Sequence, residues 1–549
     1  MITNTIISQK DAREAILSGV KKVADAVTST LGPGGRNVII ERIGMQPNVT
    51  KDGVSVARSI TLKDNFENMG AQMVIEVASK TNSSCGDGTT TATLLAYEMY
   101  KEAVKAVNDG EEPMNVKRGM LAALKEAIGE IDRNVVEIKD EGAVENVAKI
   151  SANGDTKIAE MVANIIRETG ADGIISVQES NSLDTTYSTT KGVRLDSGLK
   201  TTSLMFANDE KGGLKTTFEN CKILLHEKKL GNANELFPIL QQCVKNQFPL
   251  VIVAPDFDAD VISTLVVNRL RTGLKVAAVK APGVLEAFQR AYMTDVAVAT
   301  GGTMVSDALG LKLENAQLSD LGTAKKVEIT PDNITFIDGE ADKAKFDAHV
   351  ESLRSEMNSE GTNESMRHVI KERITKLIAG IGVVRVGGET RSIIHEKRDR
   401  IDDAICATRE AISGGIVAGG GVTLYKVGLS LLANGGEDVG RRIVGTALTT
   451  PLKKIFDNAG YLNTEEAKAI MRDYELCGVD GMPQNAGYDV SNWKFHNNLI
   501  DAGVIDPANV TKSAVTNAIS VAALLISTDC MVGIDASSVP QIDPNMLNG

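Results

Sequence analysis

Residues 86–91 read Gly-Asp-Gly-Thr-Thr-Thr, a glycine-rich break that opens a helical pattern running through Lys105. Glycines let the backbone approach a ligand closely, and the free amides at a helix N-terminus attract anions such as phosphate. Threonine hydroxyls add donors, and a carboxylate such as that of Asp87 is suited to hold Mg²⁺ beside phosphates. The same pattern is typical of plain helix capping, with Asp87 as the N-cap. From these residues alone, a phosphate site and a helix cap are both open interpretations.

Other breaks in the chain have ordinary structural interpretations when each is taken alone. Thr-Leu-Gly-Pro-Gly-Gly at 30–35 is typical of a helix end followed by proline. Lys-Asp-Gly at 51–53 favours a hairpin turn between strands predicted at 36–40 and 54–56. Gly-Gly-Gly at 419–421 is either a backbone contact with a ligand or a flexible connection. Asp-Pro at 506–507 is typical of an N-cap followed by an N1 proline.

Asp403 lies on a predicted helix, off the apolar stripe that includes Ile401, Ile405 and Ile412. This place favours a solvated carboxylate, because spacing alone cannot assign a lone aspartate as a general base. The Walker A pattern GxxxxGK[ST] and the pattern GxGxxG after a strand are both absent. If the chain hydrolyses ATP, it is therefore neither a P-loop nor a Rossmann-type protein.

The chain is organised as a helical part, an α/β part and a second helical part. Helical patterns cover 11–31 and 66–82, and they return from about residue 397 onward. In the middle, strand-like runs at 249–254 and 274–279 flank a helical pattern at 258–270. This βαβ-like arrangement predicts a separate α/β domain. Two helical ends around a different middle predict an insertion that is carried on paired connecting strands.

Composition excludes several classes of partner. The net charge is −13 with acids and bases interspersed, which argues against nucleic acid as the main partner. The 6 cysteines and 5 histidines are scattered without CxxC or HxxxH pairs, so we expect no disulfide framework or zinc site and a reducing cytoplasmic location. No apolar run approaches the ~20 residues that span a bilayer, and the N-terminus lacks a signal-peptide pattern, so we expect no membrane partner.

Several of these signals, in this order, resemble the nucleotide-site signatures of group I (GroEL-type) chaperonins, and the resemblance covers nearly the whole chain. The matching stretches are Thr-Leu-Gly-Pro at 30–33, Lys-Asp-Gly-Val-Ser-Val-Ala at 51–57, Phe-Glu-Asn-Met-Gly-Ala-Gln-Met at 66–73, Gly-Asp-Gly-Thr-Thr-Thr-Ala-Thr at 86–93, Asp-Ala at 403–404, Ala-Thr-Arg at 407–409 and Val-Ala-Gly-Gly-Gly-Val at 417–422. Residues 265–268 and 276–283 resemble the apical domain of that family.

The resemblance implies a multidomain α and α/β subunit. We expect a mainly helical equatorial domain at 1–134 and 414–549, a small α/β intermediate domain at 135–190 and 382–413, and an inserted α/β apical domain at 191–381. It implies a cytoplasmic, ATP-hydrolysing chaperonin of the protein-folding isomerase class, which captures unfolded proteins and promotes their folding in a ring cavity. The implied partners are unfolded clients, copies of itself in a seven-membered ring and, as in the family, a lid co-chaperonin.

By matched position, the resemblance also implies a site for ATP, Mg²⁺ and K⁺. Asp403 and Asp52 match the catalytic pair that orients and activates the attacking water, and Asp87 matches the Mg²⁺ ligand. Thr30 and Lys51 match the backbone carbonyl donors to K⁺. The implied nucleotide-binding residues are Thr30, Leu31, Gly32, Pro33, Lys51, Asp87, Gly88, Thr89, Thr90, Thr91, Gly420, Asp489, Val490 and Asp506. Asp489 stands where the family usually has asparagine.

Apolar residues follow one face of a predicted helix at Leu236, Phe237, Leu240 and Val244, a pattern that is usually core packing. The resemblance implies instead that part of this region is an exposed client-binding surface. The implied client-binding residues are Leu199, Met205, Phe206, Phe237, Leu240, Ile262, Val266 and Val267.

Three departures from the family pattern indicate a divergent, bacterial or phage-like member. Ser197 and Arg391 replace an intersubunit ion pair, which therefore cannot form. Residues 460–464 lack the usual acidic contact to a second ring, so ring stacking is expected to be absent or weak. Residues 544–549 lack Gly-Gly-Met repeats.

A nucleotide-binding holdase or structural ring without turnover is the alternative function, although Asp52, Asp87 and Asp403 argue against it. A metabolic kinase is a third class, but no phosphoacceptor pocket is readable.

Overall fold

The computed structural model describes residues 3–41, 47–138, 141–152, 155–170, 173–180, 182–195, 216–283, 285–306, 310–330, 333–359, 364–378, 380–434, 438–460, 469 and 483–534. The chain forms two compact units. Unit 1 comprises residues 1–164, 177–185 and 386–549, and unit 2 comprises residues 165–176 and 186–385. Unit 2 is thus an insertion within unit 1, as the helical, α/β, helical outline predicts.

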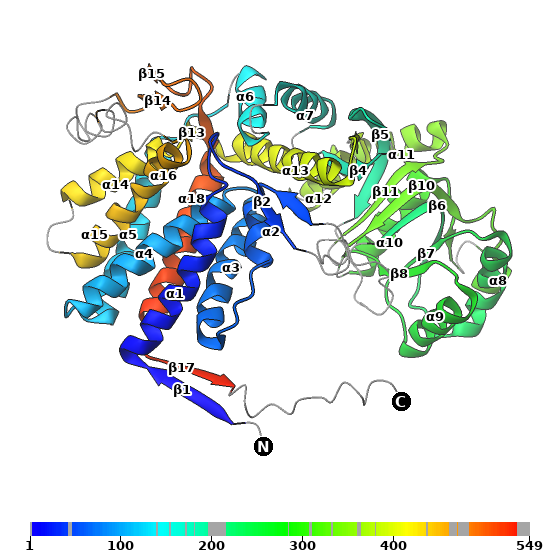
Figure 1. Ribbon diagram of the computed structural model, residues 1–549. Helices are drawn as coiled ribbons and strands as arrows, with labels where there is room; N and C mark the ends of the chain where they lie inside the picture. The colour runs from blue at the N-terminus through cyan, green and yellow to red at the C-terminus, as the bar shows by residue number, and fades with distance from the viewer. Residues whose placement is uncertain are drawn as a thin grey trace. The chain divides into compact units, whose positions relative to one another are not determined.

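Unit 1 is mainly helical (Figure 1). Its helices are α1 (Gln9–Thr28), α2 (Gly53–Arg58), α3 (Asn65–Cys85), α4 (Thr89–Asn108), α5 (Pro113–Arg133), α6 (Glu141–Ser151), most of α7 (Thr156–Thr169), α13 (Arg391–Gly414), α14 (Val422–Asn434), α15 (Val439–Leu448), α16 (Thr450–Asn458) and α18 (Ala508–Ile526). Its short antiparallel strand pairs are β1 (Asn4–Ser8) with β17 (Cys530–Ile534), β2 (Val38–Ile40) with β3 (Asn48–Thr50), β13 (Ile416–Ala418) with β16 (Ile505–Pro507), and β14 (Gly487–Asp489) with β15 (Lys494–His496).

The core of unit 1 lies among α1, α3, α4, α5 and α18. On α1, the predicted stripe that includes Ile16, Val20 and Val27 is buried. Helices α1 and α3 cross closely, because a Cβ at Gly19 would lie 1.8 Å from the carbonyl oxygen of Glu67. Within the described residues, α18 alone is long and apolar enough to cross a membrane, with a mean hydropathy of 1.2, but 61% of that window is buried, as in a core helix.

Unit 2 contains a mixed nine-stranded sheet in the order β4-β12-β5-β11-β10-β6-β7-β8, with β9 paired to β6. The strands are β4 (Ile174–Glu179), β5 (Thr186–Leu195), β6 (Thr216–His226), β7 (Leu250–Ala254), β8 (Val276–Lys280), β9 (Met304–Val305), β10 (Gly322–Ile329), β11 (Ile334–Gly339) and β12 (Gly380–Val386), and the α-helices are α8 (Phe237–Asn246), α9 (Ala259–Thr272), α10 (Glu286–Thr300), α11 (Lys343–Met357) and α12 (Glu364–Ile378). The antiparallel pair of β5 and β12 carries the insertion, as expected for its connecting strands.

The sheet of unit 2 is buried on both faces (Figure 1). Successive residues of β7 alternate between the faces, as strand geometry requires. Val251 and Val253 join a core with α10, α11 and α12. Leu250 and Ile252 join a second core with α8 and α9. Strands β7 and β8 are parallel and connected by α9, which confirms the predicted βαβ arrangement.

The strand predicted at 54–56 is wrong. Residues 54–56 are not a strand but part of α2, and β2 pairs instead with β3. The alternating pattern of Val54 and Val56 suits either structure over so short a run. Asp52 decides the outcome, because its side chain accepts hydrogen bonds from the amides of Val54 and Ser55 and so starts a helix.

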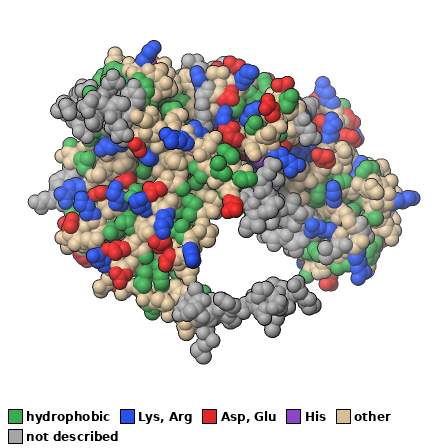
Figure 2. All heavy atoms as spheres, in the orientation of Figure 1, with side chains coloured by type: hydrophobic (Ala, Val, Ile, Leu, Met, Phe, Trp, Pro, Cys, Tyr) green, Lys and Arg blue, Asp and Glu red, His purple; other side chains and the backbone are tan. Residues whose placement is uncertain are grey.

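On the face drawn in Figure 2, Lys and Arg side chains alternate with Asp and Glu side chains rather than gathering by sign. This distribution agrees with the mixed charge pattern along the sequence.

Candidate nucleotide site

The turn at residues 86–88 connects α3 to α4. Gly86 ends α3 in the left-handed region with φ of 70°, and Gly88 is the N-cap of α4 with φ of 79°. Both angles favour glycine. No side chain caps α4, and the Asp87 carboxylate accepts a hydrogen bond from the Gly88 amide. The interpretation of Asp87 as N-cap is therefore wrong, and the first turn of α4 keeps its amides available for an anion.

Asp52 lies directly beside this helix start. Its carboxylate caps α2, with the amides of Val54 and Ser55 donating at 3.2 and 3.1 Å. A Cβ at Gly53 would lie 2.4 Å from Oγ1 of Thr90 and 2.8 Å from Oγ1 of Thr89, so only glycine allows this approach. Lys-Asp-Gly at 51–53 is thus a helix start rather than a hairpin turn, and it brings the Asp52 carboxylate to the threonines.

Asp403 reaches the same place from α13. One turn further along this helix, Cys406 packs against the turn at 86–88, since a Cβ at Gly86 would lie 2.4 Å from the Cys406 Cβ. Burial, followed by the charges of Asp87 and Asp52, raises the pKa of Asp403 well above its ordinary value. The prediction of a solvated carboxylate is wrong, because periodicity describes one helix and not the turn packed against it.

Four carboxylates gather in this region. Burial and then the charge of Asp52 raise the pKa of Asp87, while bonds from Gly88 and Ser151 oppose the shift. Burial and then the charge of Asp87 raise the pKa of Asp506 to about 7. Asp87, Asp403 and Asp506 nevertheless keep partial access to solvent. Carboxylates that are surrounded by protein yet reachable by water are typical of the floor of a binding site.

The described residues hold no group of three or more His, Cys, Asp and Glu side chains arranged as a complete metal site. Mg²⁺ rarely uses such a cage, because it usually takes one or two carboxylates together with phosphate oxygens and water. Burial and, to a smaller extent, the charge of Asp52 raise the pKa of Asp87, and a cation beside this carboxylate would offset both effects. The residues therefore fit a Mg²⁺ ion that arrives with phosphates, with Asp87 as its protein ligand.

The loop after α1 borders the threonines of α4. Oγ1 of Thr30 lies 3.3 Å from Oγ1 of Thr90. Gly32 has a φ of 77°, which favours glycine, and it stands just before Pro33. The side-chain amide of Asn458 donates to the carbonyls of Thr28 and Leu31, each at 2.9 Å, and fixes the loop. Thr89 and Thr91 share the first turn of α4 with Thr90.

Lys51 approaches the site from β3. Burial and then the charge of Arg400 lower the pKa of its ammonium group. Arg400 lies on α13, so α13 faces both Lys51 and the Asp52 carboxylate. Thr30 borders the start of α4, and Lys51 directly precedes the Asp52 cap of α2. The K⁺ site expected from their carbonyl oxygens stays a prediction.

Asp506 lies on β16, opposite Val417 of β13. A Cβ at Gly419 would come within 3.0 Å of its Oδ1, and Gly420 follows with a φ of 65°. The N-cap of α18 is Pro507, so the interpretation of Asp506 as an N-cap is wrong. Asp506 instead points its carboxylate at the glycine triplet.

Asp489 ends β14, and Val490 begins the turn of the β14–β15 hairpin. Oδ1 of Asp489 accepts from the amide and hydroxyl of Ser491 at 2.9 and 2.6 Å, and Oδ2 accepts from Asn492 at 2.7 Å. The carboxylate thus holds its own turn together. Val490 is 8% exposed and packs in a cluster with Val422. The hairpin is therefore attached to α14 by apolar contact.

Residues 23–535 match the model of the TCP-1/cpn60 chaperonin family. The chain belongs to this family. The prediction of a chaperonin and its fold class is thereby confirmed.

Two crystal structures share the fold of this chaperonin. Both are of the chaperonin gp146 from bacteriophage EL 2 (Pseudomonas aeruginosa) in the presence of ATP-BeFx, in two crystal forms. They match with TM-scores of 0.65 and 0.60 at 22% sequence identity, and each match covers 96% of this chain and 98% of the gp146 chain.

Some contacts of the chaperonin site were not indicated by any sequence motif. The hydroxyl of Ser151, at the end of α6, lies 3.5 Å from Oδ2 of Asp87. Asn458 bonds the loop after α1, and Lys426 bonds the chain before β14. Each of these side chains bonds a segment distant in sequence, so periodicity and spacing carry no signal for them.

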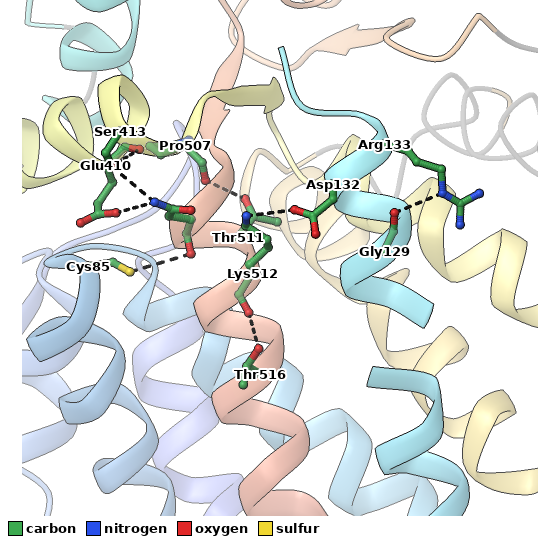
Figure 3. Close-up of polar contacts among 11 residues, drawn as sticks. Cys85, Gly129, Asp132, Arg133, Glu410, Ser413, Pro507, Thr511, Lys512 and Thr516 are labelled. Atoms are coloured by element: carbon green, nitrogen blue, oxygen red, sulfur yellow. Dashed lines mark hydrogen bonds and ion pairs between the residues drawn. The ribbon is translucent and has the colours of Figure 1, made fainter. Parts of the chain in front are cut away.

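Hydrogen bonds join α13 and α18 next to Cys85, the last residue of α3 (Figure 3). The Asn509 side chain donates to Glu410 at 3.0 Å and Ser413 at 3.4 Å, while the Cys85 thiol, 3.8 Å away, donates to the Asn509 carbonyl. One residue of α18 therefore contacts both the helix that carries Asp403 and the residue before Gly86.

On unit 2, the predicted client surface divides in two. Phe237 and Val267 are exposed at 39% and 43%, whereas Leu240 is 3% exposed and belongs to the core. Ile262 and Val266 are half-buried and pack against the same core. The structure thus contradicts Leu240 as a client contact, because its neighbours on α8 and α9 cover it. Leu199, Met205 and Phe206 lie outside the described residues.

Among the positions that depart from the family pattern, Arg391 begins α13 and Gly460 follows α16 with a φ of 82°. Ser197 and residues 461–464 and 544–549 lie outside the described residues. Ring stacking therefore stays a prediction.

Proposed function

We propose that this chaperonin binds ATP with Mg²⁺ and K⁺, hydrolyses it, and couples the cycle to capture and folding of unfolded proteins. The observation that carries the proposal is the convergence of Asp52, Asp87 and Asp403 at the uncapped start of α4. A purely structural ring needs no such cluster of mutually repelling carboxylates. The repulsion is accounted for if a cation and phosphates complete the site.

In this proposal, the amides and threonine hydroxyls at the start of α4 bind the triphosphate, helped by the loop at 30–33. Mg²⁺ held by Asp87 would neutralise charge on the phosphates. Asp403, whose pKa is raised, is placed to accept a proton from the attacking water, and Asp52 is placed to orient that water. Gly420, Asp489, Val490 and Asp506 would contact the purine and ribose, and the carbonyls of Thr30 and Lys51 would hold K⁺.

The rest of the cycle is proposed from family membership. Phe237 and Val267, with the half-buried Ile262 and Val266, form the client-binding surface. The subunits form a seven-membered ring in the cytoplasm whose stacking into pairs is weak or nucleotide-dependent, and a lid co-chaperonin closes it. Electron micrographs without nucleotide, with ATP and with ADP test the ring. Double rings in all three conditions would contradict weak stacking.

The deciding experiment is phosphate release from ATP by the purified full-length protein. We expect turnover that requires Mg²⁺, is lost on chelation and is increased by K⁺ relative to Na⁺. The alternative, a nucleotide-binding holdase, predicts ATP binding and capture of an unfolded protein without phosphate release. Absence of both binding and release would contradict the nucleotide site itself.

A further inference from the structure

Lys426 lies on α14, which begins directly after the glycine triplet at 419–421. Its ammonium group donates to the carbonyls of Pro483, Gln484 and Ala486 at 2.6, 2.9 and 3.2 Å. Three carbonyls of one short segment thus converge on a single side chain. An ammonium group has three donors, so this side chain satisfies all three oxygens at once.

Within the described part of the chain, no acidic side chain is paired with this ammonium group. Burial lowers the pKa of Lys426 to about 8, which reflects the cost of removing the charge from water. Backbone carbonyl dipoles offset that cost here in place of a carboxylate. Carbonyl oxygens that are removed from water cost free energy unless they accept hydrogen bonds. The half-buried Lys426 supplies the donors for these three carbonyls.

The segment that Lys426 holds leads directly into the hairpin at the purine side of the proposed site. Ala486 is fully buried and is followed at once by β14. The carbonyl of Asn485 accepts from the Leu499 amide at 2.8 Å, and Leu499 packs with Val490 in the cluster of α14 and the hairpin. Lys426 therefore connects the helix that follows the glycine triplet to the hairpin turn.

We propose that Lys426 is a positioning residue for the nucleotide base: it sets the β14–β15 hairpin at the correct distance from the glycine triplet, so that Val490 and the triplet form the two walls of the base site. The inference rests on the proposed ATP site. Lys426 touches neither the phosphates nor Asp52, Asp87 or Asp403 in this account. Its loss should weaken binding of the base and leave the chemistry at the phosphates intact.

The chain carries its own reporter for this hairpin. Trp493 is the single tryptophan, its amide bonds the Asp489 carbonyl at 2.7 Å, and its ring lies edge-on to Phe456 at 5.4 Å. Trp493 fluorescence in the assembled protein therefore reports hairpin packing and serves for ATP titration. The variants are Lys426→Met, which removes the donors but keeps the stem, and Lys426→Arg, which keeps the charge but cannot gather three carbonyls at one point. Lys21→Met on the exposed face of α1 is the control.

We expect Lys426→Met to raise the Kd for ATP by about tenfold, as the loss of one or two charge-assisted hydrogen bonds would. Phosphate release in a single turnover at saturating ATP should stay within about twofold of the unchanged protein, because only uniform binding is lost. Inorganic tripolyphosphate has no base, so its affinity, measured by competition with ATP, should be the same in all variants. Lys426→Arg should give an intermediate Kd, and Lys21→Met should match the unchanged protein.

An unchanged Kd for ATP in assembled Lys426→Met would overturn the inference, as would an equal loss for ATP and tripolyphosphate. If Lys426→Met does not assemble, the test is made with Lys426→Arg. The inference then requires that this variant loses affinity for ATP but not for tripolyphosphate. If the unchanged protein binds no ATP, the proposed function fails first. If it binds ATP and the ratio stays constant, only the role of Lys426 fails.

Discussion

The candidate nucleotide site of unit 1 and the predicted client surface of unit 2 were both indicated by the sequence, but the structure treats the two sets of residues differently. On unit 1, the motifs at 51–53, 86–91 and 403–409 come together as a connected site. On unit 2, the stripe on α8 divides into exposed Phe237 and buried Leu240. The glycines of these motifs mark places where another segment packs too closely against the backbone for a side chain to fit, so they constrain the fold. An apolar stripe records only that one helix face avoids water, whichever surface covers it.

The largest effect is expected from Asp403→Ala. If Asp403 is the general base, hydrolysis in a single turnover should slow by about 10²-fold or more while ATP still binds. Asp402→Ala is the matched control, since its carboxylate is on the same helix, is 44% exposed and lies 3.8 Å from Arg398. Near-normal hydrolysis in Asp403→Ala would remove this residue from the mechanism.

Asp87→Asn should have the next largest effect. Replacing the charged oxygen by an amide weakens the interaction with Mg²⁺, and we expect hydrolysis to fall by about 10- to 100-fold, as for the loss of a charged interaction. Thermal unfolding without nucleotide should change little, because Gly88 and not Asp87 is the N-cap of α4. A large loss of stability with normal activity would show that Asp87 has a structural role only.

The division of the client surface is tested by three serine substitutions. Phe237→Ser and Val267→Ser should prevent capture of an unfolded protein while ATP hydrolysis continues, because exposed apolar area is lost. Leu240→Ser should instead destabilise unit 2, by about 2–5 kcal/mol as for other deletions of buried leucine side chains. Melting of each variant and retention of a denatured client measure the two effects. A well-folded Leu240→Ser that fails in capture would restore Leu240 to the client surface.

The smallest effect concerns pH. The folded pKa of Asp506 is about 7, above the value of an unfolded aspartate, so the folded state binds the extra proton. Stability without nucleotide should therefore fall as pH rises from about 4 to 7. Asp506→Asn should reduce this pH dependence: the fall in the free energy of unfolding between pH 4 and 7 should be smaller by about 1–2 kcal/mol once screening is allowed for. Melting curves across this range check it, and an identical slope in Asp506→Asn would contradict it.

How much the sequence could predict depended on the range of the interaction. Helix α1 and the βαβ unit follow from local pattern, and the insertion on paired strands follows from the helical, α/β, helical outline. The helix at 53–58 was mistaken for a strand, because the Asp52 cap and a hairpin turn look alike over three residues. Asp403 and Asp506 were taken as a surface residue and an N-cap from their own segments, and only the family resemblance pointed to the site. Ser151, Asn458 and Lys426 were missed, since their bonds join segments that lie far apart in the chain.

The pairing of β1 with β17 bears on how the protein is made. Asn4 lies opposite Ile534, and α18 packs against α3, α4 and α5, so the core of unit 1 needs residues 508–534 to close. A nascent chain can complete unit 2, which is contiguous apart from residues 165–176, while the first four long helices of unit 1 still expose their apolar faces. Domains generally fold as units while the chain is being synthesised, and synthesis proceeds at about 5–20 residues per second. The interval before α18 emerges is thus the period in which the apolar faces of these helices lack their last packing partner.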